Sequence, residues 1–365
     1  MGKNIGIIDA DLLDHGTRHP NLTCLKLSGF HKEKGDTVRL LESWDEVTEH
    51  AQDFTHLYLA RVFDFTKIPE GILDLPNLTY GGTGFYFLPF QENGAHMLPY
   101  EVEHHMPDYH LYDAFIQKEM ARGIQASRFK DYQDYSIGFL TRGCFRGCPF
   151  CVNQTSCGVK FHAHVQEFFD PSRKYIYLWD DNVLGYPKWR DVFEELADTG
   201  RRFQFRQGMD IRIMTEEKAE VLSKARYIGE YIFAFDHPEE REQIEKGLRC
   251  WQKYNQKITK FYVLCGYDSQ DATDIAHTFM RIRFLMKYHC LPFIMRHENY
   301  AKSPYKGTYI NLSRWCNQPA LFKKMSYRQF CEANGEHSSS VRYMQQFEED
   351  YPDLAHTFYD LRWNA

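Results

Sequence analysis

The sequence lacks the features that mark several special classes of protein. No run approaches the roughly 18–20 consecutive apolar residues that a bilayer-spanning helix needs, and there is no internal repeat or low-complexity tract. Neither sign of charge dominates, because 44 Lys and Arg stand against 50 Asp and Glu, a net charge of −6. These absences exclude collagen-like, coiled-coil and wholly disordered architectures, and they provide no global attraction for nucleic acid.

The sequence does contain many aromatic residues and ten cysteines. Its 365 residues suggest about two domains, and an aromatic content of 16% predicts a large core with an aromatic-lined pocket. The first residues, MGKNIGIIDADLLDHG, carry no signal-peptide pattern, because Asp9 and Asp11 break the apolar run. We therefore expect a cytoplasmic protein without a membrane partner, whose cysteines are free thiols or metal ligands rather than disulfides.

The first third of the chain alternates between strand-like and helix-like segments. Strands are predicted at residues 4–9, 37–41, 55–63 and 78–87, and helices at 21–35, 44–52 and 111–122. This order predicts an α/β domain with a small parallel, Rossmann-like sheet over residues 1–125. Such a domain binds its ligands beyond the carboxyl ends of its strands.

The same alternation resumes on a larger scale after residue 134. Strands are predicted at 136–142, 174–180, 202–208, 230–236, 258–266 and 291–297, with helix-like stretches between them at 188–200 and 215–226. Six such units predict a partial (β/α)6 TIM-type barrel over residues 126–313, whose site lies at the carboxyl strand ends. Residues 314–365 are expected to form a helical C-terminal extension.

The segment TRGCFRGCPFC (141–151) is the most informative part of the sequence. Cys144, Cys148 and Cys151 have the spacing Cys-x3-Cys-x2-Cys and directly follow a predicted strand. Three thiolates on one loop cannot satisfy a four-iron cube, whose four corners each need a ligand, so one iron stays open. An open metal position is typical of reactive rather than structural sites.

Two alternatives remain open for these cysteines. They could form a zinc knuckle in which Cys157, His162 or His164 is the fourth ligand, although the chain contains no second Cys-x2-Cys pair. They could also be unliganded thiols in the core, which the interleaved Gly and Pro residues disfavour.

The cysteine segment resembles the cluster loop of radical S-adenosylmethionine (SAM) enzymes, including the aromatic Phe150 just before the third cysteine. The resemblance extends over residues 134–300 and implies a [4Fe-4S] cluster that binds SAM at its open iron. One electron, from a donor such as a flavodoxin or ferredoxin, then cleaves SAM to methionine and a 5′-deoxyadenosyl radical, which abstracts hydrogen from an unknown substrate. Catalytic residues of the protein itself are not identified.

The resemblance also implies a set of SAM-binding positions at the strand ends, which are Phe150, Asp180, Asp181, Asn182, Arg212 and Gly266. Each has a structural alternative. The Asp-Asp-Asn sequence could be a turn that caps the next helix. Arg212 could pair with Asp210, or Arg206 could do so, and glycine commonly ends a strand.

Residues 1–125 resemble, more loosely, the cobalamin-binding-like domain of many radical SAM enzymes. The resemblance rests on the α/β order, the turn at 35–38 and the glycine turn at 81–84. A histidine-on cobalamin domain would carry Asp-x-His-x-x-Gly, whereas Asp14, His15 and Gly16 are adjacent. Cobalamin is therefore possible but not favoured over a degenerate scaffold or substrate lid. A small molecule or peptide substrate is favoured over RNA. The one feature that would suit RNA is the basic and aromatic stretch 314–330.

Overall fold

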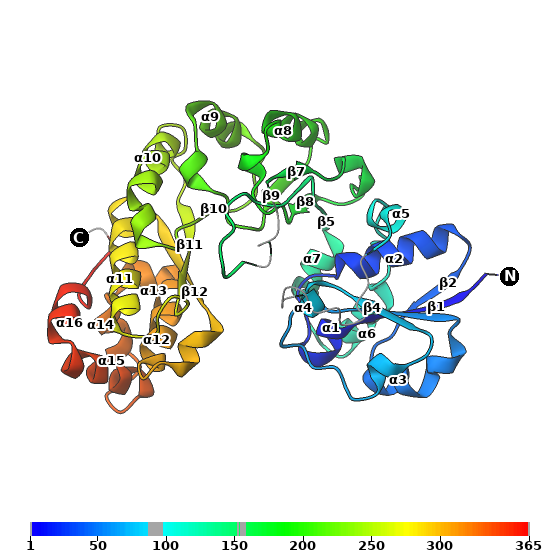
Figure 1. The fold of residues 1–365 in the computed structure, drawn as a ribbon, viewed down its shortest axis with the longest axis horizontal. Coiled ribbons are helices and arrows are strands. Elements are labelled where there is room, and N and C mark those ends of the chain that lie inside the picture. Colours follow the sequence, from blue (N-terminus) through cyan, green and yellow to red (C-terminus); the bar gives the residue numbers. More distant parts are fainter. Residues whose placement is uncertain (1, 87–97, 152, 154–157, 364–365) are drawn as a thin grey trace.

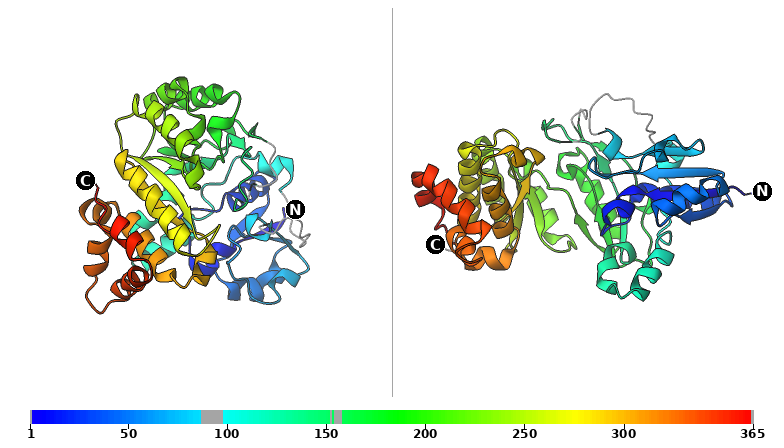
Figure 2. Two further views of the ribbon diagram at one scale, coloured as in Figure 1. Left: turned by 60° about the vertical axis from the view of Figure 1, so that its left-hand side comes forward. Right: turned by 90° about the horizontal axis from the view of Figure 1, so that it is seen from below.

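A computed structural model describes residues 2–86, 98–151, 153 and 158–363. It shows a mixed α/β protein with parallel sheets, as the alternation of predicted strands and helices indicates. Figures 1 and 2 show an N-terminal lobe, coloured blue to cyan, and a second lobe that carries the rest of the chain. None of the described helices is long and apolar enough to cross a membrane.

The N-terminal lobe is built on one parallel sheet with the strand order β2-β1-β3-β4. Its strands are β1 (Asn4–Asp9), β2 (Thr37–Leu40), β3 (His56–Ala60) and β4 (Leu78–Gly81). Its helices are α1 (Ala10–His15), α2 (Leu22–Glu33), α3 (Trp44–His50), α4 (Thr83–Tyr86), α5 (Tyr100–Glu103), α6 (Asp113–Ala121) and α7 (Lys130–Gln133). One buried cluster packs β1 against α2 and α6, and another packs the opposite face against α3.

Two predicted strands of this lobe are shorter than expected. β3 ends at Ala60 because the N–H groups of Val62 and Phe63 donate to the buried carboxylate of Asp11 instead of to a strand. β4 ends at Gly81, since Gly82 has a φ of 107° and the chain turns there into α4. Both strands therefore stop at the same edge of the sheet, next to α1.

The second lobe contains two three-stranded parallel sheets, β5-β8-β9 and β10-β11-β12. Their strands are β5 (Tyr135–Gly138), β8 (Tyr175–Leu178), β9 (Arg202–Phe205), β10 (Tyr231–Ala234), β11 (Thr259–Cys265) and β12 (Leu291–Arg296), and a separate antiparallel pair is β6 (Thr141–Arg142) with β7 (Lys160–Phe161). Isolated parallel bridges from Phe203 to Tyr227 and from Met209 to Phe233 link the two sheets. All six predicted strands are present, in chain order.

The predicted strand 136–142 is wrong in its second half. β5 ends at Gly138, where a Cβ atom would lie 2.4 Å from the ring of Phe168. The chain then leaves the parallel sheet, and Thr141 and Arg142 pair with β7. This break moves the cysteine segment away from β5 and onto an antiparallel pair of its own.

Helices cover the second lobe and continue to the C-terminus. They are α8 (Trp189–Asp198), α9 (Glu216–Lys224), α10 (Arg241–Gln252), α11 (Ala272–Lys287), α12 (Lys306–Cys316), α13 (Pro319–Lys324), α14 (Tyr327–Glu332), α15 (Ser339–Asp350) and α16 (Pro352–Phe358). The boundary predicted at residue 314 falls inside α12. The aromatic side chains of Trp315, Phe322 and Tyr327 are fully buried in the core of this lobe. They are therefore packed as in a capping helix and are not exposed for base stacking.

Candidate functional site

The cysteine loop begins and ends on the short β6–β7 pair. Thr141 lies opposite Phe161 and Arg142 opposite Lys160, so the loop leaves and returns at one place. Gly143 and Gly147 have φ values of 92° and 60°, which glycine adopts without strain. The ladder thus holds the loop at its base, and the two glycines let it fold tightly between the cysteines.

Cys144, Cys148 and Cys151 are half-buried on this loop, and none of them forms a disulfide. The backbone N–H of Arg146 donates to the Sγ of Cys144 at 3.5 Å, and that of Asn153 donates to the Sγ of Cys151 at 3.4 Å. Burial raises the pKa of the Cys148 and Cys151 thiols, and the negative charges of nearby side chains raise the pKa further. A metal at this loop would have to displace those protons, as metals do at thiol ligands.

The two histidines considered as a fourth zinc ligand, His162 and His164, both contact carboxylates instead. The Nε2 of His162 lies 3.1 Å from a carboxylate oxygen of Glu103, and the Nδ1 of His164 lies 3.4 Å from one of Glu195. Cys157, the third candidate for the fourth ligand, lies outside the described residues. Within the described part of the chain, no three or more His, Cys, Asp or Glu side chains are grouped to hold one metal ion.

Asp180 and Asp181, at the end of β8, bind the backbone around the cysteine loop. Asp180 is buried and accepts hydrogen bonds from the N–H and Oγ1 of Thr141, at 2.5 and 2.7 Å. Its burial raises the pKa to about 6, although those bonds act in the opposite direction. Asp181 accepts from the Gly143 N–H at 2.7 Å and from the Asn153 side chain at 2.5 Å. Both carboxylates therefore hold the loop in position.

Asn182, which follows these two aspartates, has a side-chain hydrogen-bond acceptor that no described residue uses. Its Nδ2 donates to the Sγ of Cys144 at 3.5 Å, while its buried Oδ1 has no hydrogen-bond partner among the described residues. The residue begins a short 3-10 helix, but its side chain makes no capping bond there. The Asn182 side chain therefore does not cap the helix. Its Oδ1 is an unsatisfied acceptor next to Cys144.

Side chains of alternating charge connect the cysteine loop to the segments that follow β9 and β10. Asp210 accepts from the Nε of Arg146 and from the Nε of Arg212, both at 2.6 Å. Arg212 also pairs with Glu240. The structure thus forms the Arg212–Asp210 ion pair that we considered as an alternative, and Arg206 instead lies over the ring of Tyr177 at 4.5 Å.

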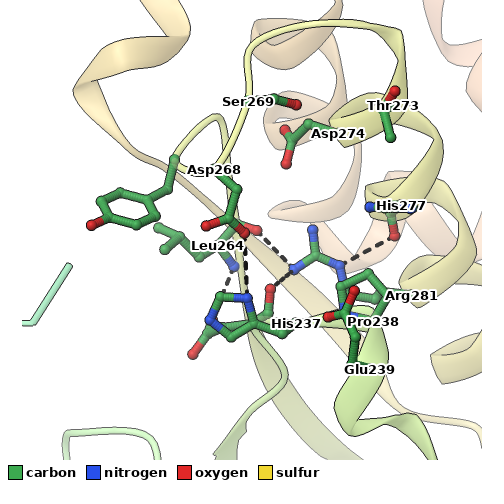
Figure 3. A pocket seen from close by; sticks show the side chains of 12 residues that line it. His237, Pro238, Glu239, Leu264, Asp268, Ser269, Thr273, Asp274, His277 and Arg281 are labelled. Atoms are coloured by element: carbon green, nitrogen blue, oxygen red, sulfur yellow. Dashed lines mark hydrogen bonds and ion pairs between the residues drawn. The ribbon is translucent and has the colours of Figure 1, made fainter. Parts of the chain in front are cut away.

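The ring of Phe150 lies beside a cavity at the ends of β10 and β11. Its centroid is 5.4 Å from that of Tyr267 and 6.0 Å from that of His237. The cavity has a volume of about 240 Å³ and is lined by His237, Asp268, Asp274 and Arg281, among others. Figure 3 shows Asp268 pointing toward His237 and Arg281 reaching across the floor.

Gly266 lies at the edge of this cavity with a φ of 74°. Its N–H donates to Asp274 at 2.7 Å, and a Cβ atom there would lie 2.9 Å from that of Tyr300. The glycine is thus required by a close approach between neighbouring strand ends.

Sequence reasoning missed several residues of this region. Asp236 is half-buried, its carboxylate accepts the Leu264 N–H at 3.1 Å, and burial raises its pKa. It is the last residue of a predicted strand, so the rule that selected Asp180 could have selected it too. Arg146 and Glu103 gave no such signal, because their partners are distant in sequence.

No family model matches this sequence, and no curated protein matches it. Among solved structures, the chain is similar to that of TsrM from Kitasatospora setae, a radical S-adenosylmethionine methyltransferase with cobalamin and a [4Fe-4S] cluster bound. The two are 12% identical, the TM-score is 0.51, and the match covers 81% of this chain and 72% of the other. The chain therefore shares its overall mixed α/β fold with that structure.

Proposed function

We propose that this protein is a cytoplasmic radical SAM enzyme. In this proposal, residues 126–313 form the radical SAM barrel, residues 314–365 a helical extension, and residues 1–125 a cobalamin-binding-like domain. The observation that carries the proposal is the cysteine loop, which presents three cysteines of the required spacing, none of them in a disulfide, on the β6–β7 ladder. The shared fold supports the same conclusion.

The residues of the loop fit a [4Fe-4S] cluster. Cys144, Cys148 and Cys151 would hold three irons, and the N–H groups directed at the sulfurs of Cys144 and Cys151 are of the kind that tunes such clusters. When bound, the cluster supplies the electron that cleaves SAM to methionine and a 5′-deoxyadenosyl radical. An external donor such as a flavodoxin or ferredoxin would reduce it.

The protein's own side chains would bind SAM and exclude water. The unsatisfied Oδ1 of Asn182 would accept a hydrogen bond from the SAM amino group, and Asp180 and Asp181 would keep the loop in place. Phe150 and Gly266 border the polar cavity, which would take the nucleoside end of SAM. Arg212 would act mainly by neutralising Asp210 behind the loop.

Anaerobic reconstitution tests this proposal directly. Reconstituted protein with dithionite and SAM is expected to form 5′-deoxyadenosine, and the Cys148→Ala variant is expected to form none. Cys290→Ala is the matched control, because that buried cysteine directly precedes β12, outside the cysteine loop, and its removal should leave the product yield unchanged. A wild-type protein with a full iron load and no product would overturn the proposal.

A second candidate function is cobalamin-dependent methyl transfer. Residues 126–365 make up only about two thirds of the chain, so a match over 81% must include part of the N-terminal lobe. The matched structure contains cobalamin. The expectation that residues 1–125 are a degenerate domain therefore has no support, and cobalamin binding fits the similarity at least as well.

A specific surface of the N-terminal lobe favours this second candidate. Val62, Phe63 and Phe65 are exposed just beyond the carboxyl end of β3, and the rings of Phe63 and Phe65 stack with centroids 5.1 Å apart. His15, at the end of α1, lies 5.5 Å from Phe65. Figure 1 shows α1 at the end of this lobe that faces the second lobe. Exposed aromatic rings at a sheet's carboxyl edge suit the apolar face of a corrinoid ring.

A further inference from the structure

Glu103, the last residue of α5, contacts both ends of the cysteine loop with one carboxylate oxygen. Its Oε1 lies 3.5 Å from the Nη2 of Arg142 and 3.1 Å from the Nε2 of His162. Arg142 ends β6 just before the first cysteine, and His162 directly follows β7. The carboxylate therefore joins the outgoing and returning arms of the loop at their base.

The same oxygen attaches the loop to the N-terminal lobe. The Nζ of Lys26, on α2, lies 3.0 Å from Oε1 and also donates to the Glu103 backbone carbonyl. The Lys26 side chain is only 6% exposed, and that of Glu103 is 23% exposed. An ammonium group buried to this degree needs its partner, because an unpaired buried charge is strongly unfavourable. The Lys26–Glu103 pair is thus a fixed point rather than an exchangeable surface contact.

A neighbouring pair reinforces the connection between the lobes. The Nδ1 of His104 lies 2.6 Å from a carboxylate oxygen of Glu167, in the segment that follows β7. The rings of His104 and His162 have centroids 5.1 Å apart. Glu103, the last residue of α5, and His104, which caps this helix, therefore contact the returning arm of the loop and its continuation.

We propose that Glu103 is a positioning residue for the cysteine loop, which it ties to the N-terminal lobe through Lys26. The part of this proposal that concerns a cluster and SAM rests on the proposed function, whereas the part that concerns the loop does not. Mechanically, the arrangement makes the loop and the N-terminal lobe move together. A cofactor held by that lobe would then keep a constant position relative to the three cysteines.

Hydrogen–deuterium exchange of the protein before reconstitution tests the loop part. Glu103→Ala should accelerate exchange of the amides in residues 140–143 and 160–162 about tenfold, since each charged hydrogen bond lost there destabilises the ladder. Glu119→Ala is the matched control: its side chain is also 23% exposed and ion-paired, but its partner Arg122 lies on the same helical segment. That variant should leave the exchange of both arms unchanged.

A second pair of variants separates positioning from folding. Glu103→Ala leaves Lys26 without its partner, so the double variant Lys26→Met with Glu103→Ala removes the buried charge while still releasing the loop. Glu103→Gln retains an acceptor oxygen and should restore slow exchange in part. The proposal predicts fast exchange of the two arms in the double variant, and wild-type exchange in the folded double variant would overturn it.

Spectroscopy of the reconstituted protein tests the cluster part. In Glu103→Ala the electron paramagnetic resonance spectrum of the reduced cluster should respond differently to SAM than in wild type, and Glu119→Ala should behave like wild type. Identical spectra in all three proteins would overturn this role. If wild type itself forms no cluster, the proposed function fails while the exchange experiment still decides whether Glu103 holds the loop.

Discussion

The side chain of Asp181 accepts a hydrogen bond at 2.7 Å from the backbone N–H of Gly143, the residue before Cys144. The segment that follows β8 is thereby attached to the start of the cysteine loop. The other Asp181 oxygen binds the side chain of Asn153, beyond the third cysteine. One carboxylate thus spans the three cysteines, in the same way that Glu103 spans the base of the loop from the opposite lobe.

Asp181→Ala should loosen the loop without unfolding the protein. Two charged hydrogen bonds are lost, and each contributes roughly 1.5–3 kcal/mol where it is well formed. We expect a lower iron content per chain after reconstitution and faster oxygen-dependent loss of the iron. Asp191→Ala, on the exposed side of α8, is the control and should match wild type in iron content. Equal iron content in both variants would show that Asp181 does not hold the loop.

Asn182→Ala should separate SAM binding from cluster binding. The Asn182 side chain contributes only a weak contact to Cys144, so the iron content should stay near that of wild type. Loss of the free Oδ1 acceptor should weaken SAM binding about tenfold, the size expected for one hydrogen bond. Titration of the reduced protein with SAM, followed by electron paramagnetic resonance, measures this change. An unchanged SAM affinity would remove Asn182 from the binding site.

Glu103 should make the free energy of unfolding depend on pH in the acidic range. Burial by itself would raise the pKa of Glu103, but the hydrogen bond with His162 and the ion pair with Lys26 outweigh it and lower the pKa to about 2. A glutamate in the unfolded chain has a pKa of about 4.3. The stabilisation is therefore complete above that pH and is lost as the pH falls toward 2, by at most about 3 kcal/mol.

Urea unfolding of wild type and Glu103→Gln over this pH range checks the prediction. The two unfolding free energies should differ most at neutral pH and converge as the pH falls from 5 toward 2, because the glutamine does not titrate. Other carboxylates affect both proteins alike, so only the difference between the curves is informative. Parallel curves would mean that Glu103 is not held in its ionised form by these contacts.

Phe65→Ala tests the proposed cobalamin surface. The Phe65 side chain is 66% exposed, so its removal should change the thermal midpoint little. If the corrinoid ring packs on this surface, hydroxocobalamin should remain with the wild-type protein through gel filtration, visible as an absorption band, and much less should remain with the variant. Phe161→Ala, an exposed aromatic on β7, is the control. Equal retention by both variants would place cobalamin elsewhere.

Much of the fold was predictable because its strands are short apolar runs with clear ends. β8, β9 and β12 lie inside the predicted segments, and α2 ends just before Gly35 as the C-cap rule indicates. The break at Gly138 was not predictable, since it depends on Phe168, a ring thirty residues away that occupies the space of a Cβ. Local pattern carries no information about such a close approach.

The candidate site shows the same division. The spacing of Cys144, Cys148 and Cys151 singled out the loop, because these three cysteines are close in sequence. The roles of the residues around it depend on contacts between distant segments. Asp180 is buried and binds Thr141 across 39 residues of sequence, and Glu103 reaches His162 from 59 residues away. Only a three-dimensional arrangement reveals which carboxylates hold the protein's own backbone.

We propose that Cys144, Cys148 and Cys151 hold a cluster whose fourth iron is free to bind SAM. The decisive experiment is electron paramagnetic resonance of the anaerobically reconstituted, reduced protein, recorded before and after the addition of SAM. We expect about four irons per chain and a spectrum that changes when SAM is added. A spectrum that SAM leaves unchanged at full iron load, or a protein that binds zinc and no iron, would contradict it.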